Sequence, residues 1–307
     1  MISFRYHLVS LVAVFLALAL GILVGTTVVK QGFIDRVTSE ANQALKTSGE
    51  LRKTVNDQAA ELSAWAQFGR VIEPLLVKGQ LQGNEVVLVT VEGVDVGEVE
   101  DVRKALEDAG AAVVAVLVVT PRMALADQSS KADLAGLLGD PGDAGSSETL
   151  SQRAATELGL RLADGFSGTG DLLQELIADR FVGLRGGTEK SLSDIGGSAQ
   201  SVVVLSGGSA PLPVEPKLFL QPLVGSLAAA SRPVVAAETL RTIYPFAPLV
   251  RSDGSLDARV VTVDNADTLP GQVAVVLGLR NLLLSPGSGG DYGQKDGASG
   301  LLPNPSP

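Results

Sequence analysis

Small polar and acidic residues follow three runs of β-branched residues, and these loops are the places where ligand chemistry is expected. They are Glu92-Gly93-Val94-Asp95, Ser206-Gly207-Gly208-Ser209 and Asp264-Asn265-Ala266-Asp267. Backbone amides of a glycine loop can bind an anion, and paired carboxylates can bind a hard cation such as Mg²⁺. Each pattern is also typical of a plain turn or of a helix cap, with Asp267 as one cap. The candidate ligand-binding residues are Ser206, Gly207, Gly208 and Asp264.

Cysteine, methionine and histidine, the residues for thiolate, imidazole and soft-metal chemistry, are scarce in this chain, although spacing alone does not exclude a carboxylate enzyme. It has no cysteine, two methionines and one histidine, His7, which precedes the long apolar run. A Ser/His/Asp triad in the body, a thiolate nucleophile and a cysteine metal site are therefore excluded. The sequence also lacks GxGxxG, a Walker loop, GxSxG and HExxH. We expect no catalytic residue, no cofactor and no metal site, and a protein that is not an enzyme.

Charge and composition narrow the class of partner and the type of core. The chain of 307 residues carries 34 acidic and 24 basic residues, a net charge of −10, which argues against nucleic-acid binding. Apolar residues make up 45% of the chain and aromatic residues only 4%. Valine, leucine and alanine must therefore fill the core, as in helices packed on a valine-rich sheet.

The first element is an apolar run, Leu8 to Val29, without a charged residue. A helix of about 20 apolar residues crosses a bilayer core, whereas a signal peptide has an apolar region of about 7–15 residues. Ala17-Leu18-Ala19 resembles a cleavage site but lies inside the run. We favour an uncleaved anchor; the alternatives are a cleaved signal and a buried helix.

Residues within and beside this run bear on how the helix packs and on how it is oriented in the membrane. Gly21 and Gly25 form a small-xxx-small pair through which two such helices can approach closely. Arg5 precedes the run, and Lys30 and Arg36 follow it, so the positive-inside count is nearly even. The short N-terminal tail favours a cytoplasmic N-terminus with the C-terminal body outside.

From Ile34 to Leu76 the pattern changes to an imperfect heptad repeat, which predicts a parallel coiled-coil dimer. Two neighbouring membrane anchors would raise the effective concentration of one helix near the other, so that even a weak seam could pair. The alternative is a single amphipathic helix folded back on the globular body. The helix is expected to end near Glu73-Pro74. The heptad register places Ile34, Val55 and Leu62 at a positions and Val37, Leu51 and Trp65 at d positions. These six are the predicted dimerisation residues.

The remaining body alternates apolar strands with helices, which predicts a doubly wound, mostly parallel α/β domain of about five strands. Strands are expected over 84–93, 111–120, 199–211, 233–239 and 257–267. Helices are expected over 96–110, 147–165 (capped by Ser147 or Thr149), 170–184, 216–232 and 269–287. The domains are then an anchor at 1–30, a coiled-coil stalk at 31–78, an α/β domain at 79–286 and a disordered tail at 287–307.

The opening MISFRYHLVSLVAVFLALALGILVGTT and the ending YG…GASGLLP resemble the actinobacterial MctB family, mycobacterial copper transport protein B. The resemblance implies an envelope protein linked to copper efflux and homeostasis, and described as a pore-forming outer-membrane channel. Corynebacterial relatives called SteB instead imply a scaffold in cell division, which controls septal peptidoglycan hydrolysis with a membrane partner, SteA.

The residues disagree with the channel part of that description. A membrane barrel needs many alternating segments of about 10 residues, whereas these strands are few, apolar throughout and separated by helices. Cu(I) prefers cysteine, methionine or histidine ligands, which the body almost lacks. Two hypotheses stay open: a component of copper transport, and a dimeric scaffold anchored in the cell membrane. An outer-membrane location follows from the family description alone.

Overall fold

The computed structural model describes residues 4–140, 145–187, 190–256 and 258–303, without the side chains of 27–35 and 187. The chain divides into two compact units, Met1–Gln67 and Phe68–Pro307. The division falls within a helix, eleven residues earlier than the predicted start of the globular domain at residue 79.

One helix, α1 (Phe4–Val77), makes up the first unit and enters the second. Its segment Phe4–Thr26 is long and apolar enough to cross a membrane. We predicted that the helix ends near Glu73-Pro74, but it continues through Pro74 to Val77. Packing explains the difference: Val77 is fully buried in the second unit, and the Lys78 amide donates to the Pro74 carbonyl at 3.1 Å.

The residues that the structure describes form one seven-stranded sheet in the order β3-β2-β1-β4-β5-β6-β7. All neighbouring strands are parallel except β3, which runs antiparallel to β2. The sheet is therefore the mostly parallel, doubly wound type that the sequence predicted. The strands are β1 (Glu85–Val91), β2 (Ala112–Val119), β3 (Val182–Gly187), β4 (Gln200–Gly208), β5 (Val234–Thr242), β6 (Val260–Val263) and β7 (Gly290–Tyr292).

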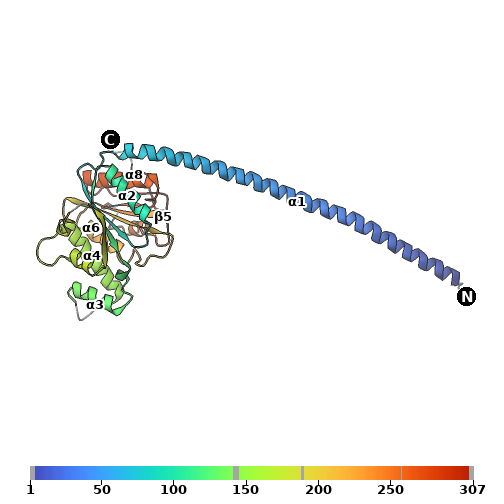
Figure 1. Cartoon of the computed structure of the whole chain (residues 1–307), viewed down its shortest axis with the longest axis horizontal. Helices are drawn as coiled ribbons and strands as arrows, with labels where there is room; N and C mark the ends of the chain where they lie inside the picture. The colour runs from blue at the N-terminus through green and yellow to red at the C-terminus, as the bar shows by residue number, and fades with distance from the viewer. Residues whose placement is uncertain (1–3, 141–144, 188–189, 257, 304–307) are drawn as a thin grey trace. The chain divides into compact units, whose positions relative to one another are not determined.

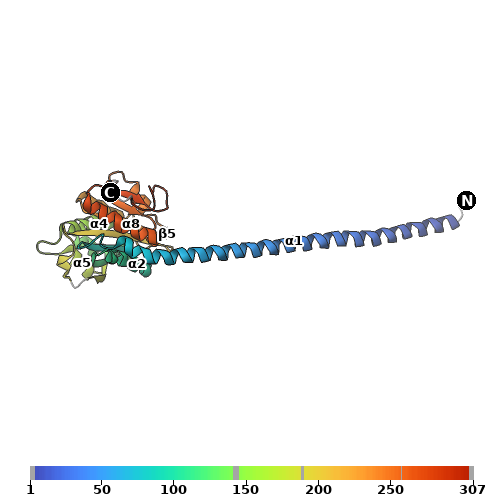
Figure 2. The same ribbon diagram turned by 90° about the horizontal axis from the view of Figure 1, so that it is seen from above.

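Helices cover both faces of the sheet (Figures 1 and 2). On one face α2 packs beside α8, and on the other α4 packs beside α6. Strands buried on both faces explain the nearly continuous apolar runs in β1 and β2. The helices of the second unit are α2 (Val96–Asp108), α3 (Gln128–Leu137), α4 (Ser147–Asp164), α5 (Leu172–Ala178), α6 (Leu220–Ala229), α7 (Ala247–Arg251) and α8 (Leu269–Leu284), with short 3₁₀ turns at Pro121–Ala124 and Leu192–Asp194.

Two predicted helix caps are each displaced by one residue. Ser146, not Ser147 or Thr149, caps α4 by accepting a hydrogen bond from the Thr149 amide at 3.1 Å. Thr268, not Asp267, caps α8 through the Gly271 amide at 3.2 Å. Serine, threonine and aspartate at neighbouring positions can all serve as caps, so composition alone does not select between them.

Two larger predictions are wrong. The helix expected over 170–184 stops at Ala178, and β3 follows, because Arg180 adopts a left-handed conformation (φ 60°) that turns the chain back toward β2. The tail expected to be disordered from residue 287 instead forms β7 and packs along β6. The glycine- and serine-rich composition suggested disorder. Pairing with β6, which is distant in the sequence, orders the segment, and composition does not reveal such a partner.

Candidate functional site

The carboxyl ends of the parallel strands bring the predicted ligand loops to one edge of the sheet. Ser206 pairs with Glu238 across β4 and β5, and Asp264 follows the end of β6. Ligands of doubly wound sheets bind outside this edge. Here the edge beside β5 and β6 is covered by the chain itself, through Gly290–Gly300, which we call the C-terminal strap.

Asp264 is fully buried, and its carboxylate has its partners within the chain. Its Oδ2 accepts a hydrogen bond from Arg251 Nη1 at 2.8 Å, and its Oδ1 accepts from the backbone amides of Gln294 at 2.7 Å and Lys295 at 3.1 Å. The guanidinium neutralises the acid, and the strap amides satisfy its remaining lone pairs. This arrangement is structural, and cation binding by Asp264 stays a prediction.

A second buried acid lies beside the first. Glu238 is fully buried and bonds to Lys295 Nζ at 2.7 Å. Its Oε2 accepts hydrogen bonds from the amides of Phe246 and Ala247 at the start of α7. The Lys295 ammonium also donates to the Thr239 carbonyl at 3.1 Å. A strap lysine therefore neutralises an acid on β5, and the strap is fastened to two strands by charge.

The glycine loop after β4 packs tightly against β5. A side chain at Gly207 would place its Cβ 2.3 Å from Thr239 Oγ1. The Gly208 amide donates to the same hydroxyl at 3.3 Å. Ser206 is fully buried, and its hydroxyl has no hydrogen-bond partner among the described residues. Close backbone approach explains the glycines without a ligand, and anion binding by this loop stays a prediction.

The third predicted loop begins α2. Asp95 caps this helix by accepting hydrogen bonds from the Gly97 amide at 2.7 Å and the Glu98 amide at 3.4 Å. Burial raises the pKa of Glu98, and the negative charges of Asp267 and Asp95 raise it further. Asp267 Oδ1 accepts from the Leu240 amide at 2.7 Å. Asp95 and Asp267 therefore hold backbone in place.

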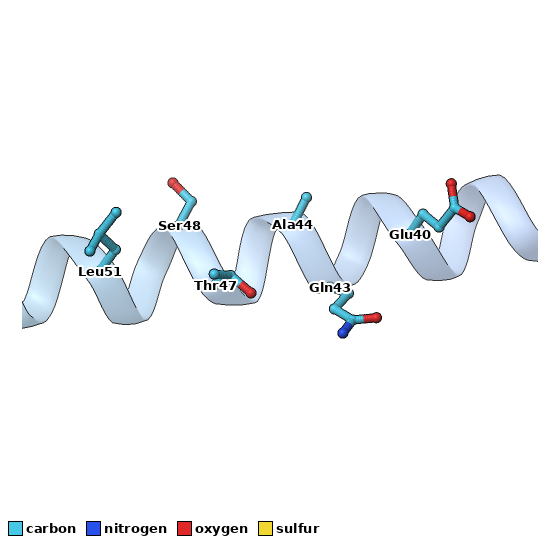
Figure 3. Close-up of a pocket in the computed structure, with 6 residues that line it drawn as sticks. All are labelled: Glu40, Gln43, Ala44, Thr47, Ser48 and Leu51. Atoms are coloured by element: carbon cyan, nitrogen blue, oxygen red, sulfur yellow. The ribbon is translucent and has the colours of Figure 1, made fainter.

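On α1, the predicted dimerisation residues Val37, Leu51, Val55, Leu62 and Trp65 have exposed side chains. Ile34 lies at 27–35, whose side chains are outside what the structure describes. A shallow hollow lies on α1, and Figure 3 shows the short side chains of Ala44 and Ser48 between the longer ones of Glu40 and Leu51. It is lined by Glu40, Gln43, Ala44, Thr47, Ser48 and Leu51.

Three of those lining residues occupy the predicted seam. Ala44 and Leu51 are at d positions and Ser48 is at an a position of the heptad register. A hollow on the seam is the shape that receives a side chain from a facing helix. In the apolar segment, nothing lies within 4 Å of a Cβ built on Gly21 or Gly25, so the small-xxx-small face is open within one chain.

A cavity of about 110 Å³ beside α2 and β3 is a feature that the sequence analysis missed. Thr90 lines it, and its Oγ1 has no hydrogen-bond partner within the described residues although the residue is only 3% exposed. The one available signal was a hydroxyl residue within the apolar strand EVVLVTV. Which residues surround Thr90 depends on the pairing of three strands and was not readable from the sequence.

The described residues contain no group of three or more histidine, aspartate or glutamate side chains placed to hold a metal ion. His7 lies exposed in the first turns of α1. Asp95 and Asp267 accept hydrogen bonds from backbone amides, and Asp264 and Glu238 also pair with bases.

These features define a class of protein: a doubly wound α/β domain on a chain whose N-terminal helix is long and apolar enough to cross a membrane. Residues 1–303 match the family described as "Copper transport outer membrane protein, MctB". The chain belongs to the MctB family.

Proteins similar to this chain over nearly their whole length come from mycobacteria. The protein named copper transporter MctB from Mycobacterium tuberculosis (strain ATCC 25618 / H37Rv) is 26% identical over an alignment of 330 positions, which covers 97% of this chain and 98% of the relative. The protein of the same name from Mycobacterium leprae (strain TN) is 26% identical over an alignment of 328 positions, which covers 98% of this chain and 99% of the relative. The resemblance seen in the N-terminal residues is thereby confirmed.

Proposed function

We propose that this protein is a single-pass, dimeric and non-enzymatic component of copper efflux or homeostasis in the cell envelope. The observation that carries the proposal is the match of residues 1–303 to a family described by copper transport. The match includes the apolar helix, the rest of α1 and the α/β domain, so the inferred role belongs to the whole chain.

The proposed location is the cell membrane, with the N-terminus inside and the α/β domain outside. The segment Phe4–Thr26 has a mean hydropathy of 2.8 and exposed side chains. An α-helix satisfies its own backbone hydrogen bonds and can therefore enter hydrocarbon without unpaired backbone groups. Its apolar side chains are then removed from water.

A second copy of the chain is the proposed partner of α1. Leu51 is 63% exposed, Val55 53% and Leu62 69%, and they recur at a and d positions of one heptad register. A water-exposed helix with such a stripe is stabilised when the stripe is buried. Two membrane anchors would hold the copies close together and so strengthen a weak seam.

The proposed contribution to copper handling is indirect. Cu(I) is bound by thiolate, thioether or imidazole groups, and the chain contains no cysteine, two methionines and one histidine. Support of a partner or of envelope integrity therefore fits this composition better than a conducted ion. A transport role through a pore in the outer membrane is the less favoured alternative.

An envelope scaffold that controls septal peptidoglycan hydrolysis with a SteA-type partner is the second candidate function. The exposed apolar stripe on α1 favours it, since a paired helix presents an extended surface to another protein. The two candidates share the dimer and differ in the process that fails when the dimer is lost.

The test replaces Leu51, Val55 and Leu62 together with aspartate in the full chain. Charges in the seam should abolish dimerisation, measured by crosslinking in membranes, and should lower the copper tolerance of cells that depend on the protein. The matched control replaces exposed b positions of the same helix, Asn42, Asn56 and Ser63, with aspartate. It adds the same charge outside the seam and should leave both measurements unchanged.

Each outcome separates the candidates. Loss of copper tolerance without a division defect supports the copper role, whereas septal defects at normal copper tolerance support the scaffold. If the seam variant crosslinks and grows normally, the proposed seam dimer has no part in either candidate function. A stoichiometric, tight copper site in the purified full-length protein would overturn the indirect mechanism.

A further inference from the structure

The cavity beside Thr90 lies on the face of the sheet that α2 and α8 cover, over the strands β1, β2 and β3. Strand pairing places Val118 between Thr90 on β1 and Gly183 on β3, and Val116 beside Arg185. Valine side chains form the walls, and Gly186 lines the β3 side. Glycine leaves this side without a covering side chain, so the space of about 110 Å³ stays open.

Polar groups lie at opposite sides of this valine-lined cavity. Thr90 is 3% exposed, and its hydroxyl lacks a hydrogen-bond partner among the described residues. Buried hydroxyl groups in folded proteins are nearly always paired, and those that are not call for a ligand, a water or a functional role. Thr90 lines the cavity, so a molecule within it could bond to the hydroxyl.

The charged residues that line the cavity differ in whether they already have an ion-pair partner. Arg103 is paired with Glu100 and Glu107 on its own helix. Arg185 has no ion-pair partner among the described residues and is exposed on β3. Glu92, also exposed, lies two residues beyond Thr90 and likewise lines the cavity. One anionic group therefore lies at the β1 side and one unpaired cation at the β3 side.

We propose that this cavity binds a short linear ω-amino carboxylate. The ligand's ammonium group donates to Thr90 Oγ1 and Glu92, its methylene groups lie on Val116 and Val118, and its carboxylate pairs with Arg185. Neighbouring strands are about 4.8 Å apart, so β1 and β3 are separated by roughly 10 Å. Arg185 also lies two residues along β3 from Gly183, the residue level with Thr90, so the two backbone positions are about 12 Å apart. Two charge-assisted hydrogen bonds of about 2.8 Å take up about 6 Å of this distance, and a chain of about five carbons spans the rest. Charge-assisted hydrogen bonds at both ends orient the ligand.

The test is calorimetric titration of the full-length protein in lipid nanodiscs with three probes. These are 5-aminopentanoate, pentanoate, which lacks the ammonium group, and pentylamine, which lacks the carboxylate. The intact zwitterion should bind about tenfold more tightly than either probe, because each of them leaves one end unpaired. Failure of 5-aminopentanoate to bind at millimolar concentration, or equal affinity for all three, would overturn the proposal.

Two variants assign the ends of the ligand. Thr90→Val keeps the side-chain shape and removes the hydroxyl, and it should weaken 5-aminopentanoate and pentylamine while pentanoate is unchanged. Arg185→Gln changes an exposed residue outside the core and should weaken 5-aminopentanoate and pentanoate while pentylamine is unchanged. Lys217→Gln changes an exposed cation that does not line the cavity, and it should change none of the three. A uniform loss, or no loss, in the first two variants would contradict the proposed binding mode.

Discussion

At the scale of single residues, Glu73 is an acid whose surroundings oppose its charge. It lies half-buried in the last turns of α1, within the second unit. Burial raises the pKa of the Glu73 carboxyl, the negative charges of Asp108 and Asp101 raise it further, and Lys104 partly offsets them. The folded protein therefore holds a proton on Glu73 at a pH where the unfolded chain has lost it.

The sign of the resulting pH dependence follows from proton linkage. Above the ordinary pKa of 4.5, the folded state binds more protons at Glu73 than the unfolded state, so stability falls as pH rises toward the folded-state pKa. Glu73→Gln should raise the melting temperature of the second unit at pH 7, and this gain should vanish below pH 4.5. Thermal denaturation of the full chain across this range measures it.

The control for this prediction is Glu61→Gln, an exposed acid on the first unit. It should leave the pH dependence of the second unit's melting temperature unchanged. A gain from Glu73→Gln that is equal at pH 4 and pH 7 would show that neutralising the charge is not the cause. Packing of the amide would then explain the effect.

At the scale of elements, the C-terminal strap depends on a glycine where its backbone meets β6. Gly293 has φ +132°, and a Cβ there would lie 2.1 Å from Asp264 Oδ1. The same carboxylate accepts the strap amides and pairs with Arg251. Any side chain at Gly293 must therefore displace the group that fastens the strap.

Gly293→Ala should destabilise the second unit by about 2–4 kcal/mol, because backbone strain and loss of a buried ion pair act together. Chemical denaturation followed by circular dichroism measures the change. Gly297→Ala is the matched control in the same strap: its φ is +88°, but the nearest atom to its Cβ is Arg251 Cδ at 3.4 Å. It should cost about 1–2 kcal/mol from backbone strain alone. Equal losses in the two variants would refute a specific role for the Asp264 contact.

At the scale of the whole molecule, the absence of cysteine makes the proposed membrane orientation directly measurable. Lys217→Cys places one thiol at an exposed position of the α/β domain. A membrane-impermeant maleimide should label it in intact cells, because the domain is proposed to lie outside the cell membrane. Labelling only after cell lysis would place the domain in the cytosol and would contradict that orientation.

The sequence determined the features that depend on neighbouring residues. The uncharged apolar run from Leu8 to Val29 predicted a helix of membrane-spanning length, and the structure has one at Phe4–Thr26. Blocks of β-branched residues between helical patterns predicted the doubly wound sheet. Burial on both sheet faces imposes such blocks on every central strand, so they are visible without a structure. The N-terminal residues likewise carried the family resemblance that the match over 1–303 confirms.

The tertiary structure alone decided which distant residues meet. Asp264 was predicted as a ligand residue, yet its partners Arg251 and Lys295 come from α7 and from a tail that composition marked as disordered. Thr90 borders a cavity only because β2 and β3 pair beside it with a glycine opposite Val118. Local patterns report whether a residue is buried, but charge pairing and cavity shape depend on strand order and register, which long-range packing sets.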